Sequence, residues 1–269
     1  MAPYPYRYAV THRRTGGFTL VELVTVIVIL GILALGTVGF IADSGRGLGS
    51  TIARSELATD ARFIVERLTR ELRNALPGSV RVSGACLEYI PVAGASRYIT
   101  LPVAGAATTF RSVPIDPLPL PADVRVAVYP GSGAYSLSSP GPVSPPASVS
   151  APDADNEVTV TFDSAHRFTS ESPTRRYFLV TGPVSYCVDG GALYRYVDYG
   201  FAAAQPGPAS LPAGLPDRAL VSEQISSTVP FTLSGATLTR NAVVALDLSL
   251  ARGDDSVHLS HLVGVRNVP

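Results

Sequence analysis

The longest apolar stretch of the sequence begins close to its start. It runs from Phe18 to Ala42, and Glu22 is its single charged residue. As an α-helix this segment would be about 37 Å long, enough to cross a hydrocarbon layer of about 30 Å with some tilt. The residues before it include three arginines and a histidine but no acid. A basic flank of this kind stays in the cytoplasm, so the rest of the chain is expected on the exported side.

A second helical pattern follows within residues 43–78. Apolar residues recur every three or four positions in 50–76, which predicts a helix with one apolar face that packs on the domain that follows. Pro77 and Gly78 are expected to end this helix. Three glycines at positions 45, 47 and 49 are expected to loosen the helix between its two halves. The apolar face comprises Leu57, Ala61, Ile64, Leu68, Leu72 and Ala75.

From residue 79 onward the pattern changes to alternating and β-branched residues, which predicts strands. Two hairpins are indicated by turn residues, Asp189-Gly190-Gly191 in one and Arg252-Gly253-Asp254-Asp255 in the other. The expected strands are 79–83, 86–90, 124–128, 157–162, 176–188, 192–199, 242–250 and 256–265.

Two segments rich in proline, serine and glycine, 130–156 and 202–217, are expected to be long surface loops. Neither half of 79–269 holds enough strands to fold alone, so we expect one β-rich domain. The predicted fold class is therefore α+β. A long N-terminal helix, with a membrane half and an amphipathic half, packs on an antiparallel β-sheet domain.

Charge and cysteine content limit the functions to be considered. The chain has 21 arginines, no lysine and 21 acidic residues, so its net charge is zero. A general nucleic-acid binder is usually basic, and we expect no nucleic-acid partner. Cys86 and Cys187 lack metal-type spacing. Because both lie on expected strands on the exported side, we predict a disulfide between them, with two free thiols as the alternative.

The residues around the start of the apolar stretch resemble a known family. The run GGFTLVELVTVIVILGILA, behind a basic leader, is similar to the N-terminus of type IV pilin and pseudopilin precursors. The resemblance implies a leader of residues 1–17, which prepilin peptidase removes by cutting between Gly17 and Phe18. It also implies N-methylation of Phe18. The alternatives are a cleaved secretory signal and a plain signal anchor; both fit less well, because secretory segments are shorter and apolar throughout.

The same resemblance assigns a role to Glu22, the acid at the fifth position of the mature chain. An ionisable residue in a membrane helix is costly and points to a function with a partner. The ammonium created at Phe18 is that partner, either four residues away in the same helix or on a neighbouring subunit. We therefore expect Glu22 to be an assembly charge. The alternative is an acid that reaches the membrane interface without such a partner.

The later sequence resembles a narrower group within this family. The segments ELATDARFIVERLTRELRNALPGSVRV and CLEYIPV are similar to minor pilins of the MshO type, which belong to the mannose-sensitive haemagglutinin (MSHA) pilus. The resemblance implies a low-abundance subunit in the tip or initiation complex, located in the inner membrane and then in the fibre. Its implied partners are other major and minor pilins, prepilin peptidase and the assembly machinery.

Two other functions remain open. One is a type II secretion pseudopilin, processed in the same way. The other is a membrane-anchored periplasmic binding module whose long loops carry recognition.

Other candidate chemistry is weak in this sequence. His258 and His261 are three residues apart on an expected strand and would lie on opposite faces, so we expect no shared metal. The acids of 153–157 lack the glycine and the distant glutamate of a calcium loop. The Arg-Gly-Asp tripeptide that begins at Arg252 is interpreted as a turn. No motif of a hydrolase, phosphate-binding loop or zinc protease occurs, and we expect neither a cofactor nor an enzymatic activity.

Overall fold

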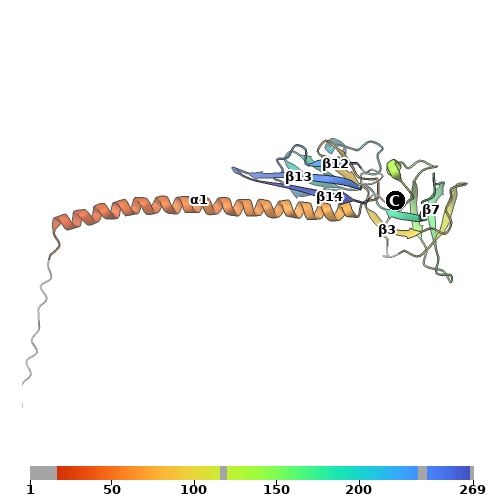
Figure 1. Ribbon diagram of the computed structural model, residues 1–269, viewed down its shortest axis with the longest axis horizontal. Coiled ribbons are helices and arrows are strands. Elements are labelled where there is room, and N and C mark those ends of the chain that lie inside the picture. Colours follow the sequence, from red (N-terminus) through yellow and green to blue (C-terminus); the bar gives the residue numbers. More distant parts are fainter. Residues whose placement is uncertain (1–16, 116–119, 236–240, 267–269) are drawn as a thin grey trace, which may run out of the picture. The chain divides into compact units, whose positions relative to one another are not determined.

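The computed structural model describes residues 17–115, 120–235 and 241–266. Most of the expected leader and the last three residues lie outside these ranges. The chain comprises two compact units, Met1–Ile52 and Ala53–Pro269. Figure 1 shows the helix and the strands along the chain.

The helix α1 runs from Leu20 to Arg73. It continues without interruption through the three glycines at 45, 47 and 49, so the prediction that the helix loosens there is wrong for its backbone. A helical glycine costs about 1 kcal/mol relative to alanine, but it keeps the N–H and C=O groups of the helix. The hydroxyls of Ser50 and Thr51 bond back to the Gly47 carbonyl oxygen, at 3.2 and 2.9 Å. The helix ends at Arg73, three residues before the predicted end at residue 76.

The described strands form three antiparallel sheets, which confirms the α+β fold class. Their orders are β1-β2-β9-β10-β11, β12-β13-β14 and β3-β8-β5-β6-β7-β4. The strands are β1 (Arg81–Ser83), β2 (Cys86–Tyr89), β3 (Val92–Arg97), β4 (Ala107–Ser112), β5 (Arg125–Ala127), β6 (Val143–Val149), β7 (Val158–His166), β8 (Arg176–Val180), β9 (Val184–Asp189), β10 (Ala192–Tyr196), β11 (Arg218–Ser222), β12 (Phe231–Ser234), β13 (Ala242–Arg252) and β14 (Asp255–Val265).

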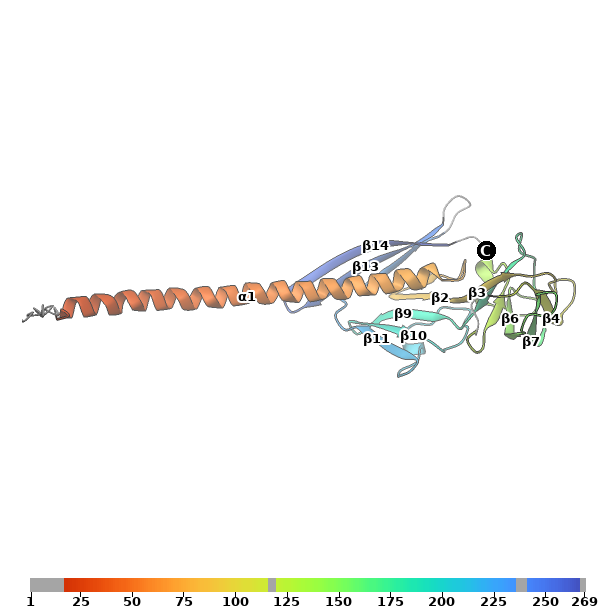
Figure 2. The same ribbon diagram turned by 90° about the horizontal axis from the view of Figure 1, so that it is seen from below.

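The five-stranded and three-stranded sheets share one core with α1. In Figure 2, β13 and β14 lie on one side of the last part of α1, and β9, β10 and β11 lie on the other. The six residues of the predicted apolar face are all buried in this core. Leu57, Leu68 and Leu72 have 0% of their surface exposed. The apolar face of the helix is thus covered by two sheets.

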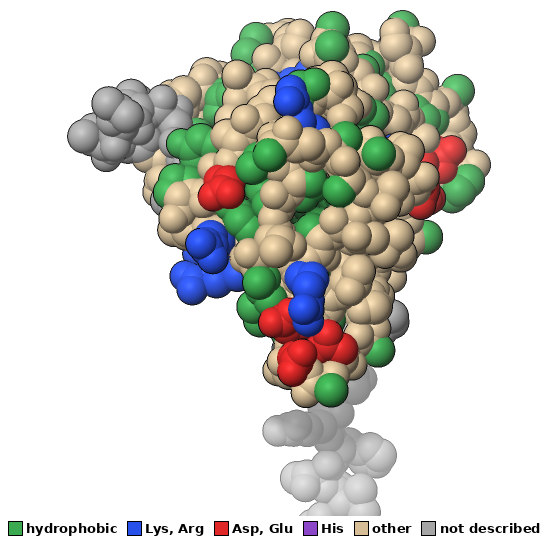
Figure 3. Space-filling view, turned by 90° about the vertical axis from the view of Figure 1, so that its right-hand side faces the viewer, with side chains coloured by type: hydrophobic (Ala, Val, Ile, Leu, Met, Phe, Trp, Pro, Cys, Tyr) green, Lys and Arg blue, Asp and Glu red, His purple; other side chains and the backbone are tan. Residues whose placement is uncertain are grey.

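The six-stranded sheet curls around a core of its own. Its two edge strands approach each other, because an isolated antiparallel bridge joins Tyr98, just after β3, to Ser112 at the end of β4. Phe110, Phe162 and Tyr177 pack inside the curl. On the face of this region that Figure 3 shows, apolar side chains are scattered among polar ones. That face therefore offers no single large apolar surface.

Both predicted hairpins form, with differences in their strands. The first turn consists of Gly190 and Gly191, which have φ values of +59° and +81°. The expected strand 176–188 is two strands, β8 in the six-stranded sheet and β9 in the five-stranded sheet. Thr181, Gly182 and Pro183 separate them, because proline has no N–H to continue a ladder.

The predicted loop 130–156 is wrong in part, because it contains β6. This strand holds Pro145 and Pro146 and still lies between β5 and β7. A side chain replaces part of the lost ladder, since the Ser144 hydroxyl oxygen accepts a hydrogen bond from the Val126 N–H at 2.9 Å. The register also shifts between Arg125 and Ala127. The predicted loop 202–217 contains one short 3₁₀ turn, η2 (Pro208–Ser210), and no strand.

Truncation of a core residue on α1 tests this architecture. We expect Leu72→Ala to lower the free energy of unfolding by about 2–5 kcal/mol, because a fully buried leucine leaves a cavity. Phe63→Ala is the matched control, since Phe63 lies on the same helix and is 54% exposed; we expect a loss below about 1 kcal/mol. Guanidinium unfolding of the full chain in mild detergent measures both values. Equal losses would contradict the packing described.

Candidate functional site

The start of α1 is fixed by a side-chain cap. Thr19 precedes the first helical residue, and its hydroxyl oxygen accepts a hydrogen bond from the Glu22 N–H at 3.2 Å. The Thr19 carbonyl accepts the N–H of Leu23 at 3.1 Å. The hydroxyl bond satisfies one of the N–H groups that have no partner in the first turn of a helix, and the Thr19 carbonyl accepts the first ordinary bond of the helix. The helix therefore begins two residues after Phe18.

Glu22 occupies the third helical position, which completes the Thr-x-x-Glu pattern of a capping box. An acid in the first turn also interacts favourably with the partial positive charge of the helix N-terminus. Glu22 thus has a local role in starting the helix, besides any role in assembly. The sequence analysis missed this role, although Thr19 and Glu22 carry its signal.

The apolar segment behind this cap has no protein cover within the described chain. Leu20–Ile41 is long and apolar enough to cross a membrane, with a mean hydropathy of 2.7 and none of its residues buried inside the protein. Phe18 is 78% exposed. Contiguous apolar surface of this size is stable only against lipid or other apolar helices. The segment fits a single-pass membrane anchor.

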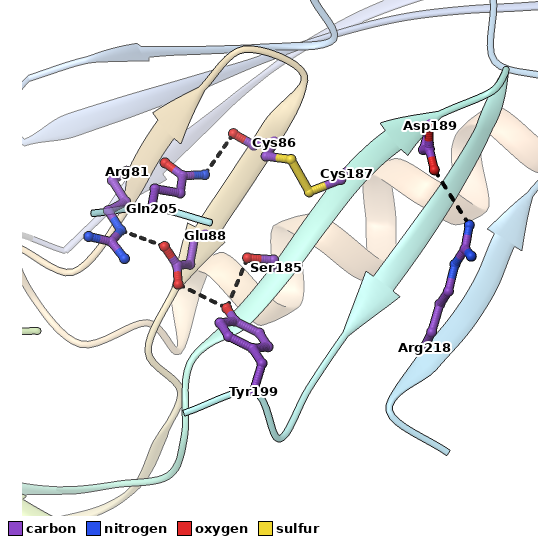
Figure 4. Close-up of a disulfide and its surroundings, with 9 residues drawn as sticks. All are labelled: Arg81, Cys86, Glu88, Ser185, Cys187, Asp189, Tyr199, Gln205 and Arg218. Atoms are coloured by element: carbon purple, nitrogen blue, oxygen red, sulfur yellow. Dashed lines mark hydrogen bonds and ion pairs between the residues drawn. A yellow bond between two sulfur atoms is a disulfide. The ribbon is translucent and has the colours of Figure 1, made fainter. Parts of the chain in front are cut away.

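The two cysteines lie in the other compact unit, on neighbouring strands. Cys86 on β2 stands directly opposite Cys187 on β9, and a disulfide joins them with an S–S distance of 2.03 Å. Figure 4 shows this bond and the polar side chains around it. The amide of Gln205 donates a hydrogen bond to the Cys86 carbonyl at 3.0 Å. Residues 202–217 are thereby attached at the disulfide.

A buried carboxylate lies beside the disulfide. Glu88 on β2 is 0% exposed, and it accepts hydrogen bonds from Arg81 and from the Tyr199 hydroxyl (Figure 4). Arg81 also donates to the carbonyl oxygens of Ala202 and Ala203, at 2.9 and 2.7 Å. A buried charge requires such pairing. This cluster holds the start of the 202–217 loop against β1 and β2.

A second carboxylate joins α1 to the five-stranded sheet. Glu71, near the helix end, accepts hydrogen bonds from the hydroxyls of Tyr89 on β2 and Tyr186 on β9. Arg195 on β10 and Arg67, one turn earlier in α1, also bond to it, at 3.3 and 3.1 Å. We call these five residues the Glu71 clamp. It connects three strands to one point of the helix.

The surroundings of Glu71 keep it ionised. Burial alone would raise the pKa of its carboxyl, but the hydrogen bond from Tyr89, the charge of Arg195 and the bonds from Tyr186 and Arg67 lower it below the ordinary value of 4.5. Burial and the Glu71 charge raise the pKa of both tyrosines above the ordinary value of 10.0. The tyrosine hydroxyls therefore remain donors, and the carboxylate remains the acceptor.

The tip of the β13–β14 hairpin is tied to the helix near residue 55. Arg54 pairs with Asp255 at 2.9 Å, and Arg252 pairs with Glu56 at 2.5 Å. Gly253 and Asp254 form the turn, and Gly253 has a φ of +58°. The glycine and aspartate of the Arg-Gly-Asp tripeptide thus form the turn, while its arginine ends β13 and pairs with Glu56.

The other candidate groups lie as follows. His258 pairs with Asp247 at 3.2 Å and with the Ser249 hydroxyl at 3.1 Å, while His261 stands opposite Leu246. Asp153 accepts the N–H groups of Asp155 and Glu157 within its own turn. Within the described ranges, no three His, Cys, Asp or Glu side chains form a group that could hold a metal ion.

Comparison with known proteins adds one finding. Residues 12–38 match the family model described as the prokaryotic N-terminal methylation motif. This match encloses Gly17, Phe18 and Glu22, and it supports a protein of the type IV pilin and pseudopilin class. Proteins of this class are in general structural, and the motif implies processing by prepilin peptidase and assembly with other pilins. Neither the curated proteins nor the solved structures gave a match.

The pH dependence of stability tests the Glu71 clamp. Because the pKa of Glu71 is lower in the folded chain than its ordinary 4.5, the unfolded chain takes up this proton first as pH falls. The stabilisation is therefore complete above pH 4.5 and is lost below it. We expect Glu71→Gln to cost about 1–3 kcal/mol at pH 7, and this difference from the native chain should shrink as pH falls below 4.5.

Unfolding curves of both chains between pH 7 and pH 3 measure this difference. All other carboxyls are common to the two chains and cancel in the comparison. Parallel curves down to pH 3 would show that Glu71 does not stabilise the fold through its charge.

Proposed function

We propose that the chain is a minor pilin of the MSHA type that acts in the initiation or tip complex of a type IV pilus. Prepilin peptidase would remove residues 1–17 by cutting between Gly17 and Phe18, and would methylate the new amino terminus. Residues 18–42 hold the subunit in the inner membrane before assembly. The basic flank faces the cytoplasm, and residues 79–269 face the periplasm.

The methylation motif over residues 12–38 carries this proposal. Its match spans Gly17, Phe18 and Glu22, the three residues on which the proposed assembly route depends. The apolar segment Leu20–Ile41, in which no residue is buried inside the protein, supports the same route, since it needs lipid before assembly and neighbouring helices afterwards. The similarity of the later sequence to MshO-type subunits supports the narrower assignment.

Glu22 acts in two ways in this proposal. In the single subunit, its position after Thr19 favours the start of the helix. In the fibre, its carboxylate meets the Phe18 ammonium of a neighbouring subunit in a medium of low dielectric constant. Each charge then offsets part of the desolvation cost of the other. A subunit enters the helix bundle in the register at which these charges meet.

Two substitutions separate these roles. Glu22→Gln keeps the capping-box chemistry, because glutamine also serves at that position, but it removes the charge. We expect Glu22→Gln and Glu22→Ala to reduce incorporation into pili alike, by about tenfold or more, since removing one partner leaves a desolvated charge unpaired. Leader cleavage should be unchanged in both. Immunoblots of sheared pili and of membranes measure incorporation and cleavage.

If the Glu22→Gln subunit were incorporated normally and the Glu22→Ala subunit were not, the role of Glu22 would be limited to helix capping. Normal incorporation of both variants would remove the assembly role of the acid altogether.

Mass spectrometry of filaments sheared from the native cells tests the function itself. We expect a peptide that begins with N-methylated Phe18, together with the Cys86–Cys187 linked peptides, in the sheared fraction. The methylated peptide in the membrane fraction alone would favour a type II secretion pseudopilin. An uncleaved leader would contradict the pilin proposal and leave an anchored binding module.

A further inference from the structure

A basic cavity lies where the end of α1 meets the six-stranded sheet. It has a volume of about 460 Å³, and Arg73, Arg176 and Arg266 line it. These arginines come from the helix end, from β8 and from the residue after β14. None of the described residues that line the cavity is acidic. In a chain with no net charge, such a cluster is a local excess of positive charge.

A fourth arginine, Arg97, lies on a strand that contributes to this cavity, although it does not itself line it. Arg97 on β3 lies directly opposite Arg176 on β8, so both side chains belong to the same face of the sheet. Ala95, two residues before Arg97, lines the cavity on that face. Like charges directly opposite each other destabilise a strand pair. Among the described residues, no acid pairs with Arg73, Arg97, Arg176 or Arg266.

The wall of the cavity is held in place by hydrogen bonds. The Asn74 side-chain amide donates to the Val92 carbonyl at 2.7 Å, and the Val92 N–H donates to the Asn74 carbonyl at 3.0 Å. An isolated antiparallel bridge also joins Ala75 to Pro91. These contacts fix the helix end, and hence the backbone of Arg73, beside β3. The basic groups are therefore brought together by the fold.

The helix dipole explains only part of this arrangement. A basic residue in the last turn, such as Arg73, interacts favourably with the partial negative charge there. That effect falls off within one turn and gives no reason for an arginine pair across β3 and β8, or for Arg266. An anion inside the cavity accounts for the three arginines that line it.

We propose that this cavity binds a phosphate or sulfate group carried on a small organic molecule. Guanidinium groups bind such oxyanions through paired N–H donors. Arginines that approach from three separate segments suit a tetrahedral anion, whose oxygens point in several directions, better than a planar carboxylate. Ala75, Val92 and Phe178 form an apolar part of the lining, which suits the carbon skeleton of the ligand. The proposal does not depend on the pilin function.

Isothermal titration calorimetry of the full chain in a neutral detergent tests this site. The probes are glucose 6-phosphate, inorganic phosphate and, as the uncharged control, glucose. We expect glucose 6-phosphate to bind, glucose not to bind, and added salt to weaken binding. The double variant Arg176→Gln/Arg266→Gln should weaken binding about tenfold or more, since charge-assisted hydrogen bonds are lost.

Arg62→Gln is the matched control, because Arg62 is an exposed arginine on α1 away from the cavity lining; it should bind as the native chain does. Thermal unfolding of each variant verifies that it is folded. Equal binding of inorganic phosphate and the ester would support the site and identify the free anion as its ligand. The proposal is overturned if neither glucose 6-phosphate nor inorganic phosphate binds, or if the double variant binds as the native chain does.

Discussion

The globular unit depends on the burial of one apolar helix face. Leu57, Leu68 and Leu72 have no exposed surface, and the core around them draws on both the five-stranded and the three-stranded sheet. The helix lies between the two sheets, and its apolar face belongs to one core that both sheets share. The burial of apolar surface supplies most of the free energy that holds these elements together. The polar contacts described next are made between elements that this burial already holds together.

Polar contacts then select one position of the helix. Apolar contacts are not directional, so a uniform apolar face tolerates small rotations and shifts. Hydrogen bonds depend strongly on distance and angle. Glu71 receives donors from three strands and from its own helix, and the pairs of Arg54 and Glu56 bind the other end of the segment to the hairpin tip. The two sets of contacts lie about four turns apart and together fix how the helix lies on the sheets.

Much of this fold could be predicted because its signals are local. The apolar periodicity of 57–75 needs only neighbouring residues, and so do the glycine turns at 190–191 and 253. Strand β6 was missed because Pro145 and Pro146 argue against an interior strand, and the compensation by Ser144 is visible only in three dimensions. The break between β8 and β9 does have a signal, Gly182-Pro183, which was not used.

Some of the candidate sites also have local sequence signals, whereas others can be seen only in three dimensions. The proposed cleavage site, Glu22 and the cap of α1 lie within six residues, although the cap at Thr19 was overlooked. The partners of Glu71 lie up to 124 residues away along the chain, and the three arginines that line the basic cavity come from three separate segments. No local sequence pattern predicts such groups, because their residues are distant in the sequence and meet only through the order of the strands.

The placement of β13 and β14 along α1 (Figures 1 and 2) has a mechanical consequence. A pull along the axis of residues 53–73 would act parallel to the surface between helix and strands. In this shear geometry the apolar contacts, the Glu71 clamp and the two ion pairs at the hairpin tip carry the load together, instead of failing one after another. The arrangement therefore suits a subunit that must stay folded under tension applied through its helix.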